Sequence, residues 1–99
     1  MEASLTGKVV LVTGAARRVG AAIAHRLHAA GASLMLHYRG AEPYAQALQA
    51  ELNAVRASSV ALVQADLLNS TGLAEIVKNT LARFERIDAL VNNASTFYP

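Results

Sequence analysis

The sequence predicts an α/β fold in which a parallel sheet is covered by helices. Four short apolar runs alternate with three longer segments whose apolar residues recur at three- and four-residue spacings. Continuous apolar runs are typical of strands buried on both faces, as in parallel sheets. The segments between them are long enough for the right-handed helical crossovers that join parallel strands. No linker, low-complexity segment or repeat interrupts this alternation.

The first strand is expected at residues 9–12 and ends at Thr13-Gly14. The helix after it stops at Gly31, because glycine favours the left-handed conformation that ends many helices. The expected apolar face of this helix consists of Val19, Ala22, Ile23, Leu27 and Ala30. The second strand is expected at residues 33–38, where Arg39-Gly40 closes it.

The second helix is expected to start near Glu42-Pro43, because proline is tolerated in a first helical turn. Its apolar face would consist of Tyr44, Ala45, Leu48, Leu52 and Val55. A third strand at residues 60–65 ends at Asp66, and residues 69–71 offer N-caps for a third helix. The apolar face of that helix would consist of Leu73, Ile76, Val77, Leu81 and Phe84. The fourth strand is expected at residues 87–91.

Composition excludes several classes of protein. The 99 residues make at most one domain, and a chain with 54% hydrophobic and 16% charged residues is not disordered. A mean hydropathy of +0.29 is high for this length, which predicts that something outside the sequence covers part of the apolar surface. Without cysteine, neither a disulfide nor a thiolate metal site is possible.

Charge and hydropathy limit the location and the partners. The net charge is +2 and basic residues cluster only at Arg17-Arg18, which is too weak for a nucleic-acid surface. No apolar run approaches the roughly 18 residues that span a bilayer, and residues 1–7 lack the layout of a signal peptide. We therefore expect a cytoplasmic protein with no nucleic-acid and no membrane partner. His25 and His28 lack a third ligand, so we expect surface positions on the first helix and no metal site.

The turn from Thr13 to Gly20 is a candidate phosphate-binding site. Small residues at a strand-to-helix turn allow the backbone to approach a pyrophosphate, and the helix N-terminus supplies N–H donors. Gly14 would make the tight turn, and Gly20 would let the helix pack closely on the sheet. The alternative is that both glycines serve only the turn and its packing.

The end of the second strand favours NADP(H) over NAD(H) as the cofactor. An acidic residue there typically binds the ribose 2′-hydroxyl of NAD, but here the sequence is His37-Tyr38-Arg39-Gly40. Arg39 could bind a 2′-phosphate, with Arg17 as a second cation, although both could also be solvated surface residues. Asp66 could accept from the adenine amino group beside Leu67, or could cap the third helix.

These motifs together resemble the short-chain dehydrogenase/reductase family. The resemblance rests on the turn, on Asp66 and on Asn92-Asn93-Ala94 after the fourth strand. The usual turn of the family is Thr-Gly-xxx-Gly-x-Gly, and here Arg18 stands where the middle glycine belongs. With residues 36–39 and 92–99, which have Ser95 in place of the usual glycine, the chain resembles the pteridine reductase branch.

The resemblance implies a Rossmann-type, doubly wound parallel sheet with strand order 3-2-1-4-5. Residues 1–99 would be its βαβαβαβ half, the N-terminal, cofactor-binding part of a single domain cut after the fourth strand. The implied cofactor-binding residues are Gly14, Arg17, Arg18, Val19, Gly20, Tyr38, Arg39, Asp66, Leu67, Asn93 and Ala94. The implied substrate-binding residues are Arg18, Ser95 and Phe97. Phe97 would stack on a flat pterin ring, although it could also belong to the core.

The implied activity is NADPH-dependent reduction of pterins of the biopterin, dihydrobiopterin or folate type by a full-length homotetramer. The alternatives are a dihydromonapterin or 3-oxoacyl-carrier-protein reductase and a catalytically inactive nucleotide-binding fragment. The catalytic Tyr-xxx-Lys pair of the family is absent, because Tyr38, Tyr44 and Tyr98 have no lysine four positions on. Hydride transfer would lack its proton donor, so the 99-residue chain alone is predicted to be inactive.

Overall fold

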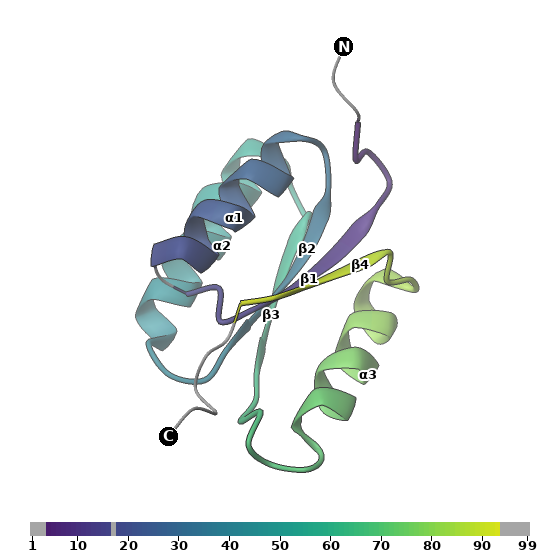
Figure 1. Cartoon of the computed structure of the whole chain (residues 1–99). Coiled ribbons are helices and arrows are strands. Elements are labelled where there is room, and N and C mark those ends of the chain that lie inside the picture. The colour runs from purple at the N-terminus through teal and green to yellow at the C-terminus, as the bar shows by residue number, and fades with distance from the viewer. Residues whose placement is uncertain (1–3, 17, 94–99) are drawn as a thin grey trace.

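The described residues form one four-stranded parallel sheet with helices on both faces (Figure 1). The structure is a computed structural model, and it describes residues 4–16 and 18–93. The elements are β1 (Val9–Thr13), α1 (Arg18–Ala29), β2 (Ser33–Tyr38), α2 (Glu42–Val55), β3 (Val60–Gln64), α3 (Gly72–Phe84) and β4 (Ala89–Asn92). This alternation confirms the predicted fold class, and each strand lies within two residues of its expected position.

The strand order in the sheet is β3-β2-β1-β4, which agrees with the order that the family resemblance implies for these four strands. All three pairings are parallel, and β1 lies between β2 and β4. In Figure 1, α1 and α2 cover one face of the sheet and α3 covers the other. The chain therefore crosses from one face to the other between β3 and β4. As in other open parallel sheets, the loops at the carboxyl ends of the strands come together at one edge.

Side chains of the strands alternate between two hydrophobic clusters. Val10, Val12, Leu34 and Leu36 join the cluster beneath α1 and α2, where they meet residues of both helices. Leu11, Met35 and Val63 form a smaller cluster with Ile76 of α3. Because β1 and β2 are buried on both faces, they have no polar face, which explains their continuous apolar sequence.

The expected helix faces are partly wrong. On α1, the side of the helix that packs on the sheet carries Gly20, Ala24 and His28, while Val19 is 64% exposed. His28 is only 2% exposed, contrary to the surface position predicted for it, whereas His25 is exposed as expected. Small residues let the helix approach the sheet closely, while Ile23 and Leu27 pack against the edge of the core as predicted.

The other two helices show the same shift. Exposed positions on α2 and α3 include four residues of the predicted apolar faces, namely Tyr44, Val55, Leu73 and Leu81. Residues buried on these helices include Ala45, Leu48 and Leu52 of α2 and Ile76 and Thr80 of α3. Thr80 escapes prediction from apolar spacing because its hydroxyl is satisfied locally, donating to the Ile76 carbonyl.

The fourth strand is less buried than predicted. Leu90 is 49% exposed, and Ala89 and Asn92 are also exposed. β4 pairs with β1 along one edge, and its other edge has no strand partner among the described residues. Within the same part of the chain, no helix combines the length and the hydropathy needed to cross a membrane.

Candidate functional site

The turn between β1 and α1 is held in a conformation that requires glycine at two positions. Gly14 has φ +62°, in the left-handed region that glycine adopts at little cost. A Cβ on Gly20 would collide with the carbonyl oxygen of Gly14 and would lie 2.8 Å from both Ala15 Cα and Asn93 Nδ2. The first turn of α1 therefore packs directly on the loop that leads into it, which both interpretations of the two glycines predict.

Arg18 takes a backbone conformation that favours glycine. Its φ is +57°, at the position where the family pattern has its middle glycine. A non-glycine residue in this region costs about 1–2 kcal/mol. The side chain is exposed at the start of α1, beside the turn. Ala41, Ser58 and Glu85 also have positive φ values, so this conformation is not confined to the candidate site.

His37 of β2 holds the turn in place through hydrogen bonds. Its Nδ1 accepts a hydrogen bond from the Gly14 N–H at 3.1 Å, and its carbonyl oxygen accepts from the Ala15 N–H at 2.9 Å. On its other side, Nε2 donates to the Ala65 carbonyl oxygen at 2.8 Å. His37 is 2% exposed, and burial lowers its pKa against the smaller, raising effect of the Ala65 carbonyl. One imidazole thus joins the ends of β1, β2 and β3.

The role of His37 is the main feature that the sequence did not reveal. Its neighbours are brought to it by the sheet register, in which His37 pairs with Val63 and Tyr38 with Gln64. A histidine inside an otherwise apolar strand was the available signal, because a buried imidazole needs partners for both nitrogens.

Asn93 ties the end of β4 to the same turn. Its Nδ2 donates to the Gly14 carbonyl oxygen at 3.0 Å, and its backbone N–H donates to Thr13 Oγ1 at 2.9 Å. Thr13 Oγ1 in turn lies 3.1 Å from Asn92 Oδ1. The Asn93 side chain therefore lies against the turn, and its assignment to the cofactor stays a prediction.

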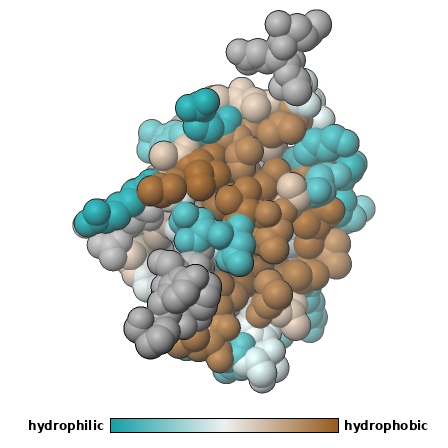
Figure 2. Space-filling model, in the orientation of Figure 1, coloured by the Kyte–Doolittle hydropathy of each residue, from teal (hydrophilic) through white to brown (hydrophobic). Residues whose placement is uncertain are grey.

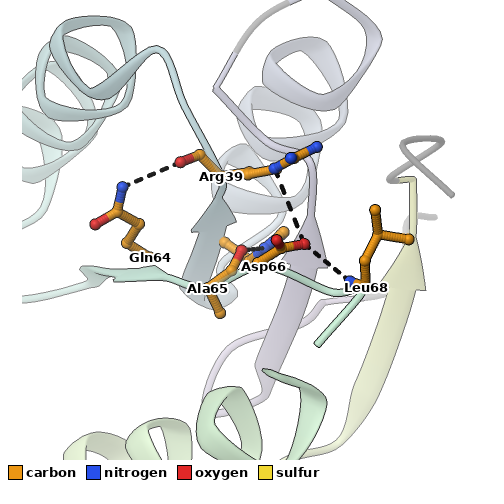
Figure 3. A network of polar contacts seen from close by, with 6 residues as sticks. Arg39, Gln64, Ala65, Asp66 and Leu68 are labelled. Atoms are coloured by element: carbon orange, nitrogen blue, oxygen red, sulfur yellow. Dashed lines mark hydrogen bonds and ion pairs between the residues drawn. The ribbon is translucent and has the colours of Figure 1, made fainter. Parts of the chain in front are cut away.

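Arg39 and Asp66 lie side by side where β2 and β3 end (Figure 3). Arg39 Nε is 3.9 Å from Asp66 Oδ1, and both side chains are about half exposed. The Gln64 side chain donates to the Arg39 carbonyl oxygen at 3.0 Å, which joins the two strand ends (Figure 3). The sheet thus brings together the two residues assigned to the 2′-phosphate and the adenine.

The carboxylate of Asp66 does not cap α3, which was the alternative reading. Asp66 Oδ1 accepts from the Leu68 N–H at 2.9 Å, whereas the N-cap of α3 is Thr71. Leu67, the other residue assigned to the adenine, packs partly against the cluster beneath α3. A Cβ on Gly72 would collide with the Asp66 carbonyl oxygen, so the loop lies tightly on the helix start.

The remaining predicted site residues divide into two groups. Tyr38 is 8% exposed, and burial, followed by the charge of Glu42, raises the pKa of its hydroxyl. Val19 is exposed on the first turn of α1. The residues that lie outside the described ranges are Arg17, Ala94, Ser95 and Phe97. Across residues 4–16 and 18–93, no group of three or more His, Cys, Asp or Glu side chains could hold a metal ion.

Comparison with known proteins relates most of the chain to one family of oxidoreductases. A family model described as short chain dehydrogenase matches residues 8–98. Pteridine reductase 1 of Leishmania tarentolae is 41% identical, in an alignment that covers all of this chain and 40% of the relative. A 3-oxoacyl-[acyl-carrier-protein] reductase of Synechocystis sp. is 42% identical over 92% of this chain and 36% of the relative.

A third relative is more distant. A hydroxynaphthalene reductase-like protein of Metarhizium brunneum is 38% identical over 94% of this chain and 34% of its own length. The chain thus spans between 34% and 40% of the length of these three relatives. All three are named as reductases or reductase-like proteins, although their named substrates differ.

Proposed function

Because this chain belongs to the short-chain dehydrogenase family, we propose that it forms the cofactor-binding part of an NADP(H)-dependent reductase. The observation that carries the cofactor assignment is Arg39 at the end of β2, where an NAD-specific site would place a carboxylate. Arg39 is about half exposed, and its distance to Asp66 is longer than a hydrogen bond. A 2′-phosphate could therefore compete for the guanidinium.

The turn of this chain fits a dinucleotide. Gly14 and Gly20 have no side chains, so a ligand could approach the backbone of the turn closely. At Gly20 even a single Cβ would collide with the turn. The start of α1 directs backbone N–H groups and a partial positive charge to the same place. In this proposal Asn93 and His37 hold the turn in position. Arg18 and Arg39 bind phosphate groups of the cofactor. Asp66 accepts a hydrogen bond from the adenine amino group. The bound cofactor would supply a hydride to the substrate.

Replacing Arg39 by aspartate tests the cofactor assignment. Arg39→Asp is expected to weaken NADPH binding to the intact protein at least about tenfold, because charge-assisted hydrogen bonds are lost and a like charge is introduced. NADH binding should be unchanged or stronger. Fluorescence titration with both cofactors measures the ratio.

The matched control for this test is Arg26→Asp, which makes the same charge change at an exposed position of α1. It should leave the ratio of NADPH to NADH affinity as it is. An Arg39→Asp variant with the wild-type ratio would contradict the NADP assignment.

For the substrate, we propose a pterin of the biopterin, dihydrobiopterin or folate type. Support comes from the 41% identity to a pteridine reductase over the whole chain and from the strained Arg18 beside the turn. In this proposal Arg18 donates to a pterin oxygen or a phosphate, and Ser95 and Phe97 line the pterin. We further propose that the intact protein is a homotetramer, which light scattering can test.

The second candidate substrate is a 3-oxoacyl group on acyl-carrier protein. It is favoured by the 42% identity to the reductase of Synechocystis sp.. Steady-state kinetics of the intact protein with dihydrobiopterin, dihydrofolate and a 3-oxoacyl thioester separate the two. A kcat/KM for the thioester above that for both pterins would overturn the pterin assignment.

A further inference from the structure

The two hydrogen-bond partners of His37 determine which ring nitrogen carries the proton. The Ala65 carbonyl oxygen can only accept, so Nε2, 2.8 Å away, must carry a hydrogen. The Gly14 N–H can only donate, so Nδ1, 3.1 Å away, must offer its lone pair. The two contacts together require the neutral ring with the proton on Nε2. A protonated ring would carry an N–H at Nδ1 and would face the Gly14 N–H donor to donor.

The contact to Gly14 has a consequence for the turn as a whole. With both the Gly14 and the Ala15 N–H groups bound to His37, the loop is held down on β2. From the other side, Asn93 holds the Gly14 carbonyl oxygen. The peptide groups on both sides of Gly14 are therefore fixed in direction before any ligand arrives. Such fixed backbone groups lower the ordering cost of ligand binding.

We propose that neutral His37 is the positioning residue of the cofactor turn, and that its Nδ1 acceptor, rather than its contact to Ala65, sets the affinity for the cofactor phosphates. This inference rests on the proposed function. Loss of the acceptor would leave the partly buried Gly14 N–H without its partner, and the loop would have to shift to satisfy it. Protonation of His37 would have the same effect.

The surroundings of His37 favour the neutral ring. Its pKa is lowered by burial, and only the Ala65 carbonyl acts in the other direction. The nearby loops and helix start carry Arg18, Arg39 and Asp66, and α3, which packs on the face of β2 that includes Met35, carries Glu75, Lys78 and Arg83. No charged side chain is among the causes of the shift. The hydrogen bond from Gly14 to His37 is therefore present near neutral pH. It should be lost only under acidic conditions, when the ring becomes protonated.

Two amide substitutions separate the two hydrogen bonds, because each places one polar atom near one nitrogen of the imidazole. In His37→Asn, the amide oxygen can take the place of Nδ1 and accept from Gly14, but nothing reaches Ala65. In His37→Gln, the amide nitrogen can take the place of Nε2 and donate to Ala65, but the Gly14 N–H loses its acceptor. Each variant gives up one of the two bonds, so their losses of stability should be similar. Their affinities for the cofactor should differ.

The experiment is a titration of the intact protein with NADPH, followed by fluorescence at pH 7.5. The Asn variant should bind within about threefold of wild type, and the Gln variant at least about tenfold more weakly. Equal affinities of the two variants, or weaker binding by the Asn variant, would overturn the inference. If no protein, wild type included, binds NADPH, the proposed function fails instead.

A pH profile keeps the inference testable if the Gln variant does not fold. Because burial lowers the pKa of His37, the effect is expected only at a pH below that at which a free imidazole protonates. There, wild-type affinity should decrease more steeply than that of the Asn variant, which has no imidazole to protonate. The 2′-phosphate of the cofactor also titrates, with a pKa of about 6, but it does so equally for both proteins. Parallel profiles would overturn the requirement for the neutral ring.

His28 provides the matched control. It is a second histidine with 2% exposure, and its Nε2 contacts Ser59 Oγ at 2.7 Å. It lies near the end of α1, whereas the turn adjoins the helix start. His28→Asn should lower the melting temperature and leave the NADPH affinity unchanged. An affinity loss in this variant equal to that of His37→Gln would show that lost stability, rather than lost positioning, is being measured.

Discussion

At the scale of single residues, the turn leaves no room for an added methyl group at Gly20. A Cβ there would meet backbone atoms of Gly14 and Ala15 as well as the Asn93 side chain, and backbone cannot move aside cheaply. Gly20→Ala is therefore expected to lower the free energy of unfolding by about 1–3 kcal/mol, as overpacking does. Urea denaturation followed by circular dichroism measures the loss.

Gly40→Ala is the control for this substitution. A Cβ on Gly40 would have no heavy atom within 4 Å. Its free energy of unfolding should stay within about 0.5 kcal/mol of wild type, as for ordinary surface changes. Equal losses in the two variants would mean that Gly20 does not pack as described.

At the scale of elements, a carboxylate joins the beginnings of β1 and β4. Asp88 Oδ2 accepts from the Val9 N–H at 2.8 Å, and the Val9 carbonyl oxygen accepts from the Asp88 N–H. Arg86 donates to both carboxylate oxygens, at 2.8 and 2.7 Å. The hydrogen bond from Arg86, and next that from Val9, lower the pKa of Asp88. The charged carboxylate therefore stabilises the pairing of the two strands.

The pH dependence of this contact follows from the direction of the shift. Since the pKa of Asp88 is lower in the folded than in the unfolded chain, its contribution is complete above the unfolded value. It is lost as the pH falls through the folded value. Asp88→Asn should lower stability at pH 7. Below about pH 4 the variant should lose less further stability than wild type, because it has no carboxylate to protonate. Thermal melts between pH 3 and 7 test this, with Glu85→Gln as the control. Identical acid limbs for Asp88→Asn and wild type would contradict the role of Asp88.

The strands could be predicted from the sequence more completely than the helix faces. A run such as Val9–Thr13 is buried on both sides, so it can be predicted as a strand without deciding which of its faces is buried. A helix has one buried side, and on α1 that side is chosen by Gly20 and Ala24, whose small size allows close packing. Counting apolar residues gives more weight to Val19, which is large but faces outward.

Only part of the candidate site was predictable for a related reason. Gly14, Arg39 and Asp66 stand at strand ends, so their sequence positions alone place them at one edge of the sheet. The contacts of His37 depend on the register between β2 and β3, which apolar spacing does not determine. His28 escaped prediction in the same way, because its partner Ser59 belongs to a distant loop.

At the scale of the whole molecule, the surface near β4 is unusually apolar. Figure 2 shows a broad hydrophobic face in the orientation in which Figure 1 presents β4 and α3. Leu73, Leu81 and Leu90 of these elements are each 45–49% exposed. Together with the edge of β4 that has no strand partner in the described part of the chain, this face favours association. These exposed leucines account for part of the high mean hydropathy of the sequence.

The 99-residue chain by itself is expected to associate as its concentration rises. Leu90→Lys should weaken this association, because it places a charge on the apolar face beside the open edge. Val55→Lys, which changes a 76% exposed residue on α2, should not. Sedimentation velocity over a range of concentrations compares the three proteins. A wild-type chain that stays monomeric throughout would contradict the expectation.

The central position of β1 also determines the order in which the sheet can be completed on the ribosome. The strand receives β2 on one edge soon after it is made, but its other edge must wait for a partner 79 residues later in the sequence, as the bond from Val9 to Asp88 shows. At 5–20 residues per second, roughly 1–6 s separate the end of β3 from the end of β4. During that interval the edge of β1 that later pairs with β4 is unpaired, so edge-to-edge association of the nascent chain is expected to be most favoured while α3 is being synthesised.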